Sequence, residues 1–332
     1  MKNKPSNSFA EFQFDPTALA APRKPGISAY MRIKNGGEFL RLAIVSHLQF
    51  YDEIIAVYND CTDDTEATLF DLQNQYPDTI KIFHYLPKVH PCQSDEHTKT
   101  PTDSVHSMAN YFNYALSKTT YNVATKLDDD HLAIPCNLTS LTKTIRADNA
   151  VGKQKIYTFS GINLMREGSS ILAGGLIEHP FSGNGDIYYH PVSKNIFFSQ
   201  RKSFERMNRP HRKEMENEYM GIMYFHLKYL KQDFGYANLS HKVKKRSIEK
   251  LLNESLFVPY DEFRSKRHYK RLKKALSKRD QFWCAFWSVK ALRKLRHSVG
   301  GKHLSLLKMR FALLADDLKN IDFRRDVLDK LN

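Results

Sequence analysis

Between residues 27 and 127, short apolar segments alternate with longer amphipathic segments. The apolar segments ISAYMRI, EIIAVY and NVATKL are typical of strands that are buried on both faces of a sheet. The intervening segments place apolar residues three and four positions apart, which is typical of helices that pack by one face. We therefore predict strand 27–33, helix 38–50, strand 53–60, helix 65–76, strand 80–86, helix 104–119 and strand 122–127.

Such alternation predicts an α/β fold in which helices cover both faces of a mostly parallel sheet. Ligands of these sheets bind at the carboxyl ends of the strands, so we expect a site just after residues 33, 58, 86 and 127. The pattern then changes: IYTFSGINLM, SSILAGGLI and DIYYHPV are strand candidates, and EMENEYMGIMYFHLKYLKQ is predicted to be a helix. From Ile248 onward the sequence is expected to be helical and basic.

The predicted organisation has four parts. Residues 1–26 hold four prolines and are expected to form a loose arm, so that order begins at Ile27. Residues 27–150 form a first half with the ligand site, and residues 151–247 form a second half that covers it and holds a second substrate. Residues 248–332 form a basic helical C-terminal region.

Composition narrows the class of protein. The chain has 332 residues, 41% hydrophobic and 26% charged, a balance that is typical of globular proteins. No apolar run approaches the roughly 18 residues that span a bilayer, and the first residues lack the apolar segment of a secretory signal. The four cysteines have no CxxC spacing, so they are expected to be reduced thiols. These features predict a cytoplasmic protein.

The net charge of +15 is concentrated in one segment. Residues 241–310 contain 21 Lys and Arg against 5 Asp and Glu, whereas the rest of the chain carries a net charge of −1. This distribution predicts a basic module that faces a polyanion. Residues 265–299 add Trp and Phe at helical spacing, which favours an anionic membrane surface. The alternative is that these helices pack on the rest of the protein. No nucleic-acid motif accompanies the charge.

The strongest local signal for chemistry is KLDDDH, residues 126–131. Asp128, Asp129 and Asp130 directly follow a predicted strand, at the expected binding edge of the sheet. Adjacent carboxylates repel one another unless a cation compensates them, and divalent cations prefer oxygen ligands. We therefore predict that Asp128 and Asp130 bind a divalent metal. The alternative, a solvated acidic turn, does not explain the position at the strand end.

A second acidic cluster, NDCTDDT, follows the second predicted strand. Asp60 and Asp63 are expected to face the same crevice as the first cluster. Asp and Thr are also ordinary capping residues at the start of a helix, and this reading stays open for the second cluster.

In order, RIKN (32–35), DEIIAVYNDCTDDT (52–65), Asn110 and KLDDDH (126–131) resemble the family 2 glycosyltransferases of the GT-A fold. The resemblance covers residues 27–131 well. It implies a nucleotide-sugar site in the first half and an acceptor side in the second. It further implies that Asp128 and Asp130 form the DXD motif, which holds Mn²⁺ or Mg²⁺ on the sugar nucleotide. The implied nucleotide-binding residues are Asn35, Asn59, Asp60, Asp63 and Asp128.

The resemblance also suggests roles for residues of the second half. His226 is a candidate metal ligand, and Lys228 and Lys231 are candidate diphosphate contacts, because some GT-A enzymes use a late histidine in this way. Packing or solvent exposure is the alternative for this histidine. The candidate catalytic bases are Glu216 and Glu218, which otherwise are acids that favour a helix N-terminus. Glu214, Asp186, His179 and His190 are weaker polar candidates.

These features together predict a metal-dependent, hexosyltransferase-like enzyme. Its expected donor is a nucleotide sugar, in the first place a UDP-sugar, and its expected acceptor a glycan or lipid-linked glycan in bacterial surface polysaccharide synthesis. The protein is expected in the cytoplasm, peripherally at the inner membrane face. The alternatives are a nucleotidyltransferase of related fold, for which NGGEF is a poor phosphate loop, and a nonenzymatic basic protein that binds membrane or nucleic acid.

Overall fold

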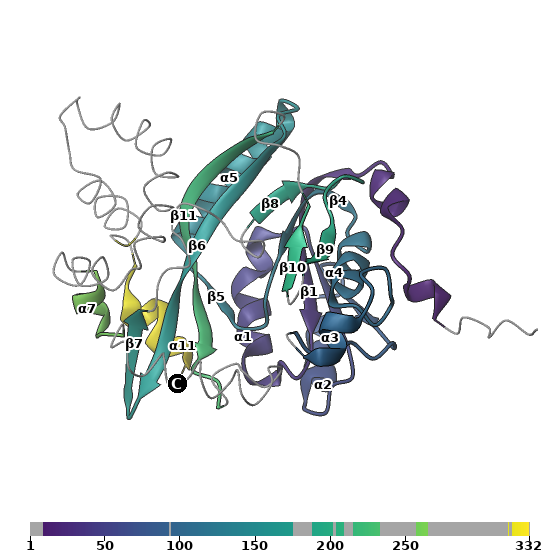
Figure 1. Cartoon of the computed structure of the whole chain (residues 1–332). Coiled ribbons are helices and arrows are strands. Elements are labelled where there is room, and N and C mark those ends of the chain that lie inside the picture. The colour runs from purple at the N-terminus through teal and green to yellow at the C-terminus, as the bar shows by residue number, and fades with distance from the viewer. Residues whose placement is uncertain are drawn as a thin grey trace, which may run out of the picture.

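The computed structural model of the chain (Figure 1) describes residues 9–92, 94–174, 188–201, 204–208, 215–232, 257–264, 318 and 321–331. The strands are β1 (Lys24–Ile33), β2 (Glu53–Tyr58), β3 (Ile80–His84), β4 (Tyr121–Lys126), β5 (His131–Ala133), β6 (Lys155–Glu167), β7 (Ser170–Gly174), β8 (Tyr188–Pro191), β9 (Phe198–Arg201), β10 (Phe204–Met207) and β11 (Glu216–Tyr229). The α-helices are α1 (Gly37–His47), α2 (Thr65–Gln75), α3 (Asp95–Lys99), α4 (Met108–Ser117), α5 (Pro135–Ala150), α7 (Tyr260–Phe263) and α11 (Asp329–Leu331). Short 3₁₀ turns are η1 (Ala10–Phe12), η2 (Pro16–Ala20) and η3 (Leu48–Phe50), and a π-helical turn, η4, spans Arg324–Leu328.

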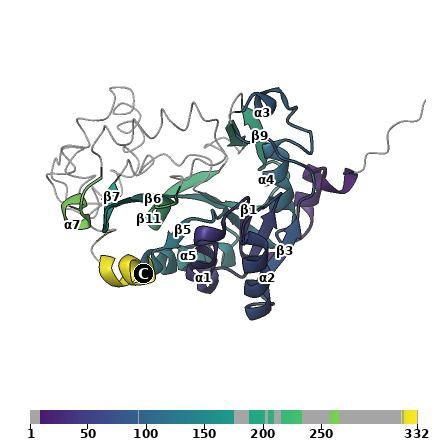
Figure 2. The same cartoon turned by 90° about the horizontal axis from the view of Figure 1, so that it is seen from below.

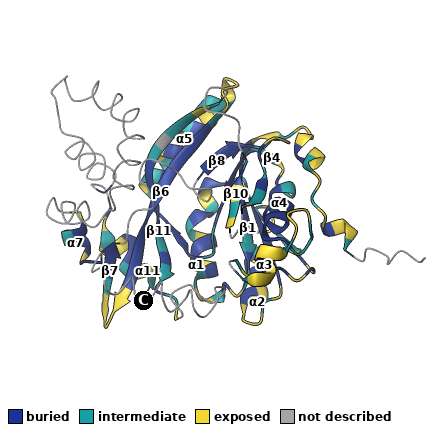
Figure 3. Ribbon diagram, in the orientation of Figure 1, coloured by how far each residue is buried: buried dark blue, intermediate teal, exposed yellow. Residues whose placement is uncertain are grey.

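One large sheet organises the described part of the chain, with strand order β3-β2-β1-β4-β8-β6-β11-β5 and β7 beside β6. Strands β1 to β4 are mutually parallel, and so are β6 and β11. Strands β5, β7 and β8 run antiparallel to their neighbours. The predicted strands and helices of residues 27–127 are confirmed by β1, α1, β2, α2, β3, α4 and β4. Strand β2 is buried along its whole length, and β1 along most of it (Figure 3). The fold is α/β with a mostly parallel sheet, as predicted.

Helices cover both faces of the sheet, as Figure 2 shows. Helices α1, α2 and α5 pack on one face through a single hydrophobic cluster that includes Leu40, Leu69 and Leu141. Helix α4 packs on the opposite face with the hairpin β9–β10, which pairs separately from the large sheet. This sandwich leaves the strand ends as the place where polar side chains can gather.

The N-terminal segment is packed from Phe9, earlier than the predicted start at Ile27. Phe12 and Leu19 are buried against the cluster around α4. The side chain of Asn110 explains the order, because its Nδ2 donates to the backbone of Phe12 and its Oδ1 accepts from the backbone of Phe14. The expectation of a loose arm is therefore wrong for residues 9–23.

The predicted helix over residues 214–232 is wrong, because Glu216–Tyr229 forms strand β11. This strand lies between β6, which it joins in parallel register, and β5. Its central residues, 221–225, are buried on both faces. A continuously apolar segment of this kind carries no periodicity, so pairing with two neighbouring strands decides its conformation.

The predicted basic helical stripe of residues 265–299 lies outside the described residues. The described C-terminal residues 321–331 pack with α7 against β5, β6 and β11, where Phe323 stacks on Tyr260. No described helix has both the length and the apolar character that crossing a membrane requires.

Candidate functional site

The two acidic segments lie at one edge of the sheet. Strand β1 separates β2 from β4, and all three are parallel, so their carboxyl ends meet at this edge. The turn between β1 and α1 lies between the two segments. The Gly36 amide donates to Thr65, and a Cβ atom on Gly36 would lie 2.3 Å from the Asp129 carboxylate. A glycine is required at Gly36 because of this close approach.

Three potential metal ligands converge beside β4. One carboxylate oxygen of Asp130 and one ring nitrogen each of His131 and His226 lie within 4.8 Å of one another. His226 Nε2 is 3.3 Å from Asp130 Oδ1, and His226 Nδ1 is 3.0 Å from Asn163 Oδ1. The pairing of β5 with β11 creates this arrangement, because it sets His226 directly opposite His131. We call these three residues, with Asp128 and Asp129, the acidic site.

The acidic site is buried and strongly polarised. Burial acts to raise the pKa of Asp130, but His226 and Lys231 outweigh burial and hold that pKa well below its usual value. Burial lowers the pKa of His131 to about 3 against the opposing charge of Asp128. His131 is therefore neutral at physiological pH. A carboxylate and a neutral imidazole are the protonation states that bind a metal.

Lysine side chains balance part of the negative charge. Lys231 Nζ lies 3.0 Å from Asp130 and 3.3 Å from Asp129. Asp128 is held by Lys126 at 2.9 Å and lies 3.7 Å from His131. Burial and the other two carboxylates raise the pKa of Asp129 to about 7, although Lys231 opposes the shift. The described lysines thus leave the three carboxylates incompletely neutralised, which suits a bound cation.

Two residues of the NDCTDDT segment are used for structure. Asn59 is fully buried, and its Nδ2 donates to the backbone oxygens of Tyr85 and Pro87. Asp63 accepts hydrogen bonds from the Gly37 and Thr65 amides. These contacts fix the loop at the end of β2, which agrees with the capping role left open by the sequence for Asp63.

Two further predicted nucleotide contacts, Asn35 and Asp60, are exposed to solvent. Asp60 is more than half exposed and pairs with Lys34 at 2.8 Å. Asn35 is exposed, and its Oδ1 accepts from the Thr62 amide. Both residues have positive φ angles, +46° for Asp60 and +52° for Asn35. Asp60 and Asn35 therefore frame the sheet edge beside the acidic site.

The predicted bases lie far from the acidic site. Glu216 and Glu218 pair in register with the start of β6, whereas His226 pairs near its other end. Eight residues of strand from Glu218 to His226 correspond to roughly 26 Å. Glu218 instead forms an ion pair with Lys155 at 2.9 Å. The structure thus brings His226 and Lys231 to Asp130 and carries both glutamates to the opposite edge. Lys228 follows His226 along the same strand.

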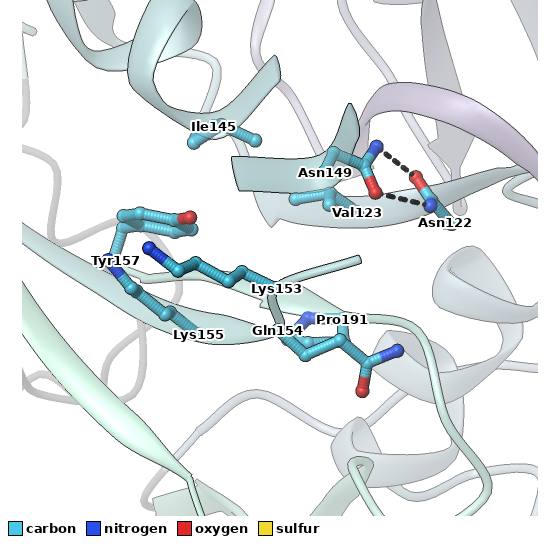
Figure 4. A pocket seen from close by; sticks show the side chains of 9 residues that line it. All are labelled: Asn122, Val123, Ile145, Asn149, Lys153, Gln154, Lys155, Tyr157 and Pro191. Carbon is cyan, nitrogen blue, oxygen red and sulfur yellow. Dashed lines mark hydrogen bonds between the residues drawn. The ribbon is translucent and has the colours of Figure 1, made fainter. Parts of the chain in front are cut away.

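A pocket lies near that opposite edge, where β4 and β6 begin and α5 ends (Figure 4). Asn122 and Asn149 exchange two amide hydrogen bonds in its wall, at 2.7 and 2.9 Å. Lys155 and Tyr157 complete the wall and both contact Asp148. This pocket belongs to a structural network and contains none of the residues of the acidic site.

Some contributors to the acidic site had no distinct signal in the sequence. His131 stands next to the three aspartates but was not predicted as a ligand, and it gains this position only through the pairing of β5 with β11. Asn163 holds the His226 ring from β6, more than thirty residues after the acidic segment. Glu214, Asp186 and His179 lie outside the described residues. His190 belongs to β8 within the sheet and is buried, and its ring meets Tyr30 edge-on.

The chain is similar in sequence to one family of known proteins. The sequence model of a family described as beta-1,4-N-acetylgalactosaminyltransferase (CgtA) matches residues 8–148, which include β1 to β5 and the three aspartates. A search of curated protein sequences gives no significant match.

Two solved structures are similar to this chain at low sequence identity. TarS 1-349 of S. aureus is 13% identical with a TM-score of 0.38, and the match covers 76% of this chain and 82% of that one. Glucosyl-3-phosphoglycerate synthase of Mycobacterium tuberculosis, in complex with Mn²⁺, UDP and glucosyl-3-phosphoglycerate, is 15% identical with a TM-score of 0.36. That match covers 76% of this chain and 86% of the synthase.

The family match over residues 8–148 includes the parallel strands β1 to β4 and the acidic segment at their carboxyl ends. The α/β sheet, the acidic segment after β4 and this match lead to the same assignment. The chain is a glycosyltransferase that is similar to this family over residues 8–148, and its fold is α/β around a mostly parallel sheet.

Proposed function

We propose that this enzyme transfers a sugar from a nucleotide-sugar donor with the help of a divalent cation at the acidic site. The observation that carries the proposal is the convergence of Asp130, His131 and His226 within 4.8 Å. Asp130 and His226 would hold the cation, with Asp128 beside them. Because the donor set combines carboxylate and imidazole, it fits Mn²⁺ better than Mg²⁺, which prefers oxygen ligands throughout.

The chemistry of transfer explains the surrounding charges. Transfer from a nucleotide sugar expels a nucleoside diphosphate, and a bound cation would neutralise the negative charge that develops on this leaving group. Lys231 stands at the same place, 3.0 Å from Asp130, and adds a positive charge toward the phosphates. Asn35 and Asp60 remain the proposed contacts for the nucleoside, because they frame the exposed edge. Glu216 and Glu218 are left out of the catalytic set.

We infer that the donor is a UDP-sugar, with UDP-N-acetylgalactosamine as the first candidate. The family that matches residues 8–148 is described as an N-acetylgalactosaminyltransferase, and this part of the chain contains the donor side of the sheet. The acceptor proposed from the sequence is a glycan or a lipid-linked glycan of the bacterial surface.

Binding of donor and cation tests the proposal directly. Wild-type protein should show a higher Tm when Mn²⁺ and UDP-N-acetylgalactosamine are added together, because ligands that bind the folded state stabilise it. Asp130→Asn should abolish this shift and release of UDP, while Asp71→Asn, an exposed aspartate on α2, should behave as wild type. An equal Mn²⁺-dependent shift and equal turnover in Asp130→Asn would refute the metal assignment.

We further propose that the basic residues of 241–310 hold the enzyme at an anionic membrane, where a lipid-linked acceptor resides. The support is the sequence alone: this segment carries 21 basic and 5 acidic residues. Each basic residue near such a surface contributes about 1 kcal/mol. Cosedimentation with anionic liposomes should exceed that with neutral ones and should fall with added salt. Equal partition onto both kinds of liposome would contradict the proposal.

A further inference from the structure

A second group of metal-ligand side chains lies apart from the acidic site. Cys92 precedes α3, His97 belongs to α3, and Glu205 belongs to β10. One donor atom of each, the thiol sulfur, a ring nitrogen and a carboxylate oxygen, lies within 4.8 Å of the other two. Cys92 and His97 are five positions apart in the chain, and Glu205 follows more than a hundred positions later. The packing of the hairpin β9–β10 on the segment before α4 brings them together.

His97 shows why this group needs a ligand. Its side chain is only 1% exposed, and neither ring nitrogen makes a hydrogen bond with any residue that the structure describes. The backbone around it is well fixed, because its amide donates to Ser94 and its carbonyl accepts from Gln200. A buried polar group without a partner costs about 1 to 3 kcal/mol. The backbone thus holds the His97 ring in a buried position that lowers stability, and a metal ion bound to a ring nitrogen would remove this penalty.

The approach of His97 to Glu205 fits two ligands of one ion. His97 Nε2 and Glu205 Oε1 are 3.3 Å apart, yet they are not aligned as a hydrogen bond. In a tetrahedral zinc site with bonds of about 2.0–2.1 Å to nitrogen and oxygen, two such ligands stand about 3.3 Å apart. The observed separation of the two atoms therefore equals the edge of a zinc coordination tetrahedron.

We propose that Cys92, His97 and Glu205 bind Zn²⁺. One thiolate, one imidazole and one carboxylate form a mixed donor set that suits zinc, and the soft thiolate ligand selects zinc over the harder Mg²⁺ and Mn²⁺. The ion would tie β10 to the segment that leads from β3 to α4. That segment starts at the same edge of the sheet as the acidic site. The zinc would therefore stiffen the chain beside the proposed donor site.

Cobalt(II) substitution tests the proposal, because a cobalt–thiolate bond gives a charge-transfer band in the near ultraviolet. Metal-depleted full-length protein should bind one Co²⁺ per chain with this band, and Zn²⁺ should displace it. Cys92→Ser should abolish the band. His97→Gln should weaken Co²⁺ binding by at least about tenfold, because even the loss of a residue that only contacts a ligand typically lowers metal affinity by about 10- to 100-fold. Cys136→Ser is the matched control, since Cys136 is an exposed cysteine on α5. Asp130→Asn should keep the band, which separates this site from the acidic site.

A measurement on the wild-type chain covers the case in which a variant fails to fold. Zn²⁺ should slow alkylation of Cys92 by iodoacetamide at least about tenfold, as read from its peptide by mass spectrometry, and should leave Cys136 unchanged. A thiolate band that survives in Cys92→Ser, or alkylation of Cys92 at the same rate with and without Zn²⁺, would overturn the proposal.

Discussion

Asp129 offers a test of the acidic site that does not depend on catalysis. Its side chain is 18% exposed and sits between two other aspartates, with Lys231 3.3 Å away. Its pKa is raised from the usual 3.8 to about 7. We expect Asp129→Asn to stabilise the protein when divalent cations are absent, because the amide carries no charge that the fold must bury.

The size of the effect follows from the pKa and its sign. The fold favours the neutral form of Asp129, so ionisation lowers stability progressively as the pH rises from 3.8 to about 7 and by a constant amount above that. About three pKa units correspond to about 4 kcal/mol at pH 8, and about one unit to under 2 kcal/mol at pH 5. The stabilisation by Asp129→Asn should therefore increase by about 2 to 3 kcal/mol between pH 5 and pH 8.

Urea unfolding at both pH values, with EDTA present, measures this difference. Asp71→Asn is the control, because Asp71 is half exposed and pairs with Arg41 at the surface, where such a pair contributes about 0 to 1 kcal/mol. Added Mn²⁺ should narrow the gap between wild type and Asp129→Asn, since the cation would compensate the wild-type carboxylates. A stability difference that is equal at pH 5 and pH 8, or a variant less stable at pH 8, would refute the reasoning.

Three further substitutions test other parts of the structure. Glu218→Gln should change the rate of sugar transfer by less than about twofold and lower the free energy of unfolding by about 1 kcal/mol, because Glu218 forms a structural ion pair with Lys155. A hundredfold loss of transfer would instead show that Glu218 is catalytic. Lys231→Gln should lower kcat/KM by about 10- to 100-fold through loss of one charge-assisted contact of about 1.5 to 3 kcal/mol, and transfer at the wild-type rate would exclude a role toward the diphosphate. Glu53→Gln should cost about 3 kcal/mol in urea unfolding, because Glu53 is buried and bonded to Lys81 at 2.6 Å. Burial raises the pKa of Glu53, but its hydrogen bonds outweigh burial and lower that pKa overall. The contribution of Glu53 to stability should therefore be present near pH 7 and be lost as the pH falls through the lowered pKa. A loss of stability in Glu53→Gln that is the same at every pH would contradict this reasoning.

Local pattern was sufficient for the first half of the chain. Strands β1, β2 and β4 are short apolar runs bounded by polar turns. A strand that is buried on both faces of a sheet needs such a run, so the sequence indicates these strands directly. Because these strands are parallel, their order along the chain also placed the aspartates after β4 at the ligand-binding edge.

Local pattern failed for β11, with consequences for the candidate site. The segment 221–225 is apolar throughout, so neither a helical nor a strand period can be read from it. A helix would have kept Glu218 and His226 about two turns apart, roughly 12 Å. The strand separates them by about 26 Å and assigns them to opposite edges.

The sequence by itself determined the alternation of strands and helices in residues 27–127 and the acidic segment at the end of β4, because both depend on neighbours in the chain. Only the tertiary structure decided which distant residues join that segment. The register of β5 against β11 sets His226 opposite His131, and the packing of β10 on α3 brings Glu205 to His97. Register between distant strands depends on the packing of the whole sheet, so the local sequence pattern does not show that residues 131 and 226, or 97 and 205, lie close together.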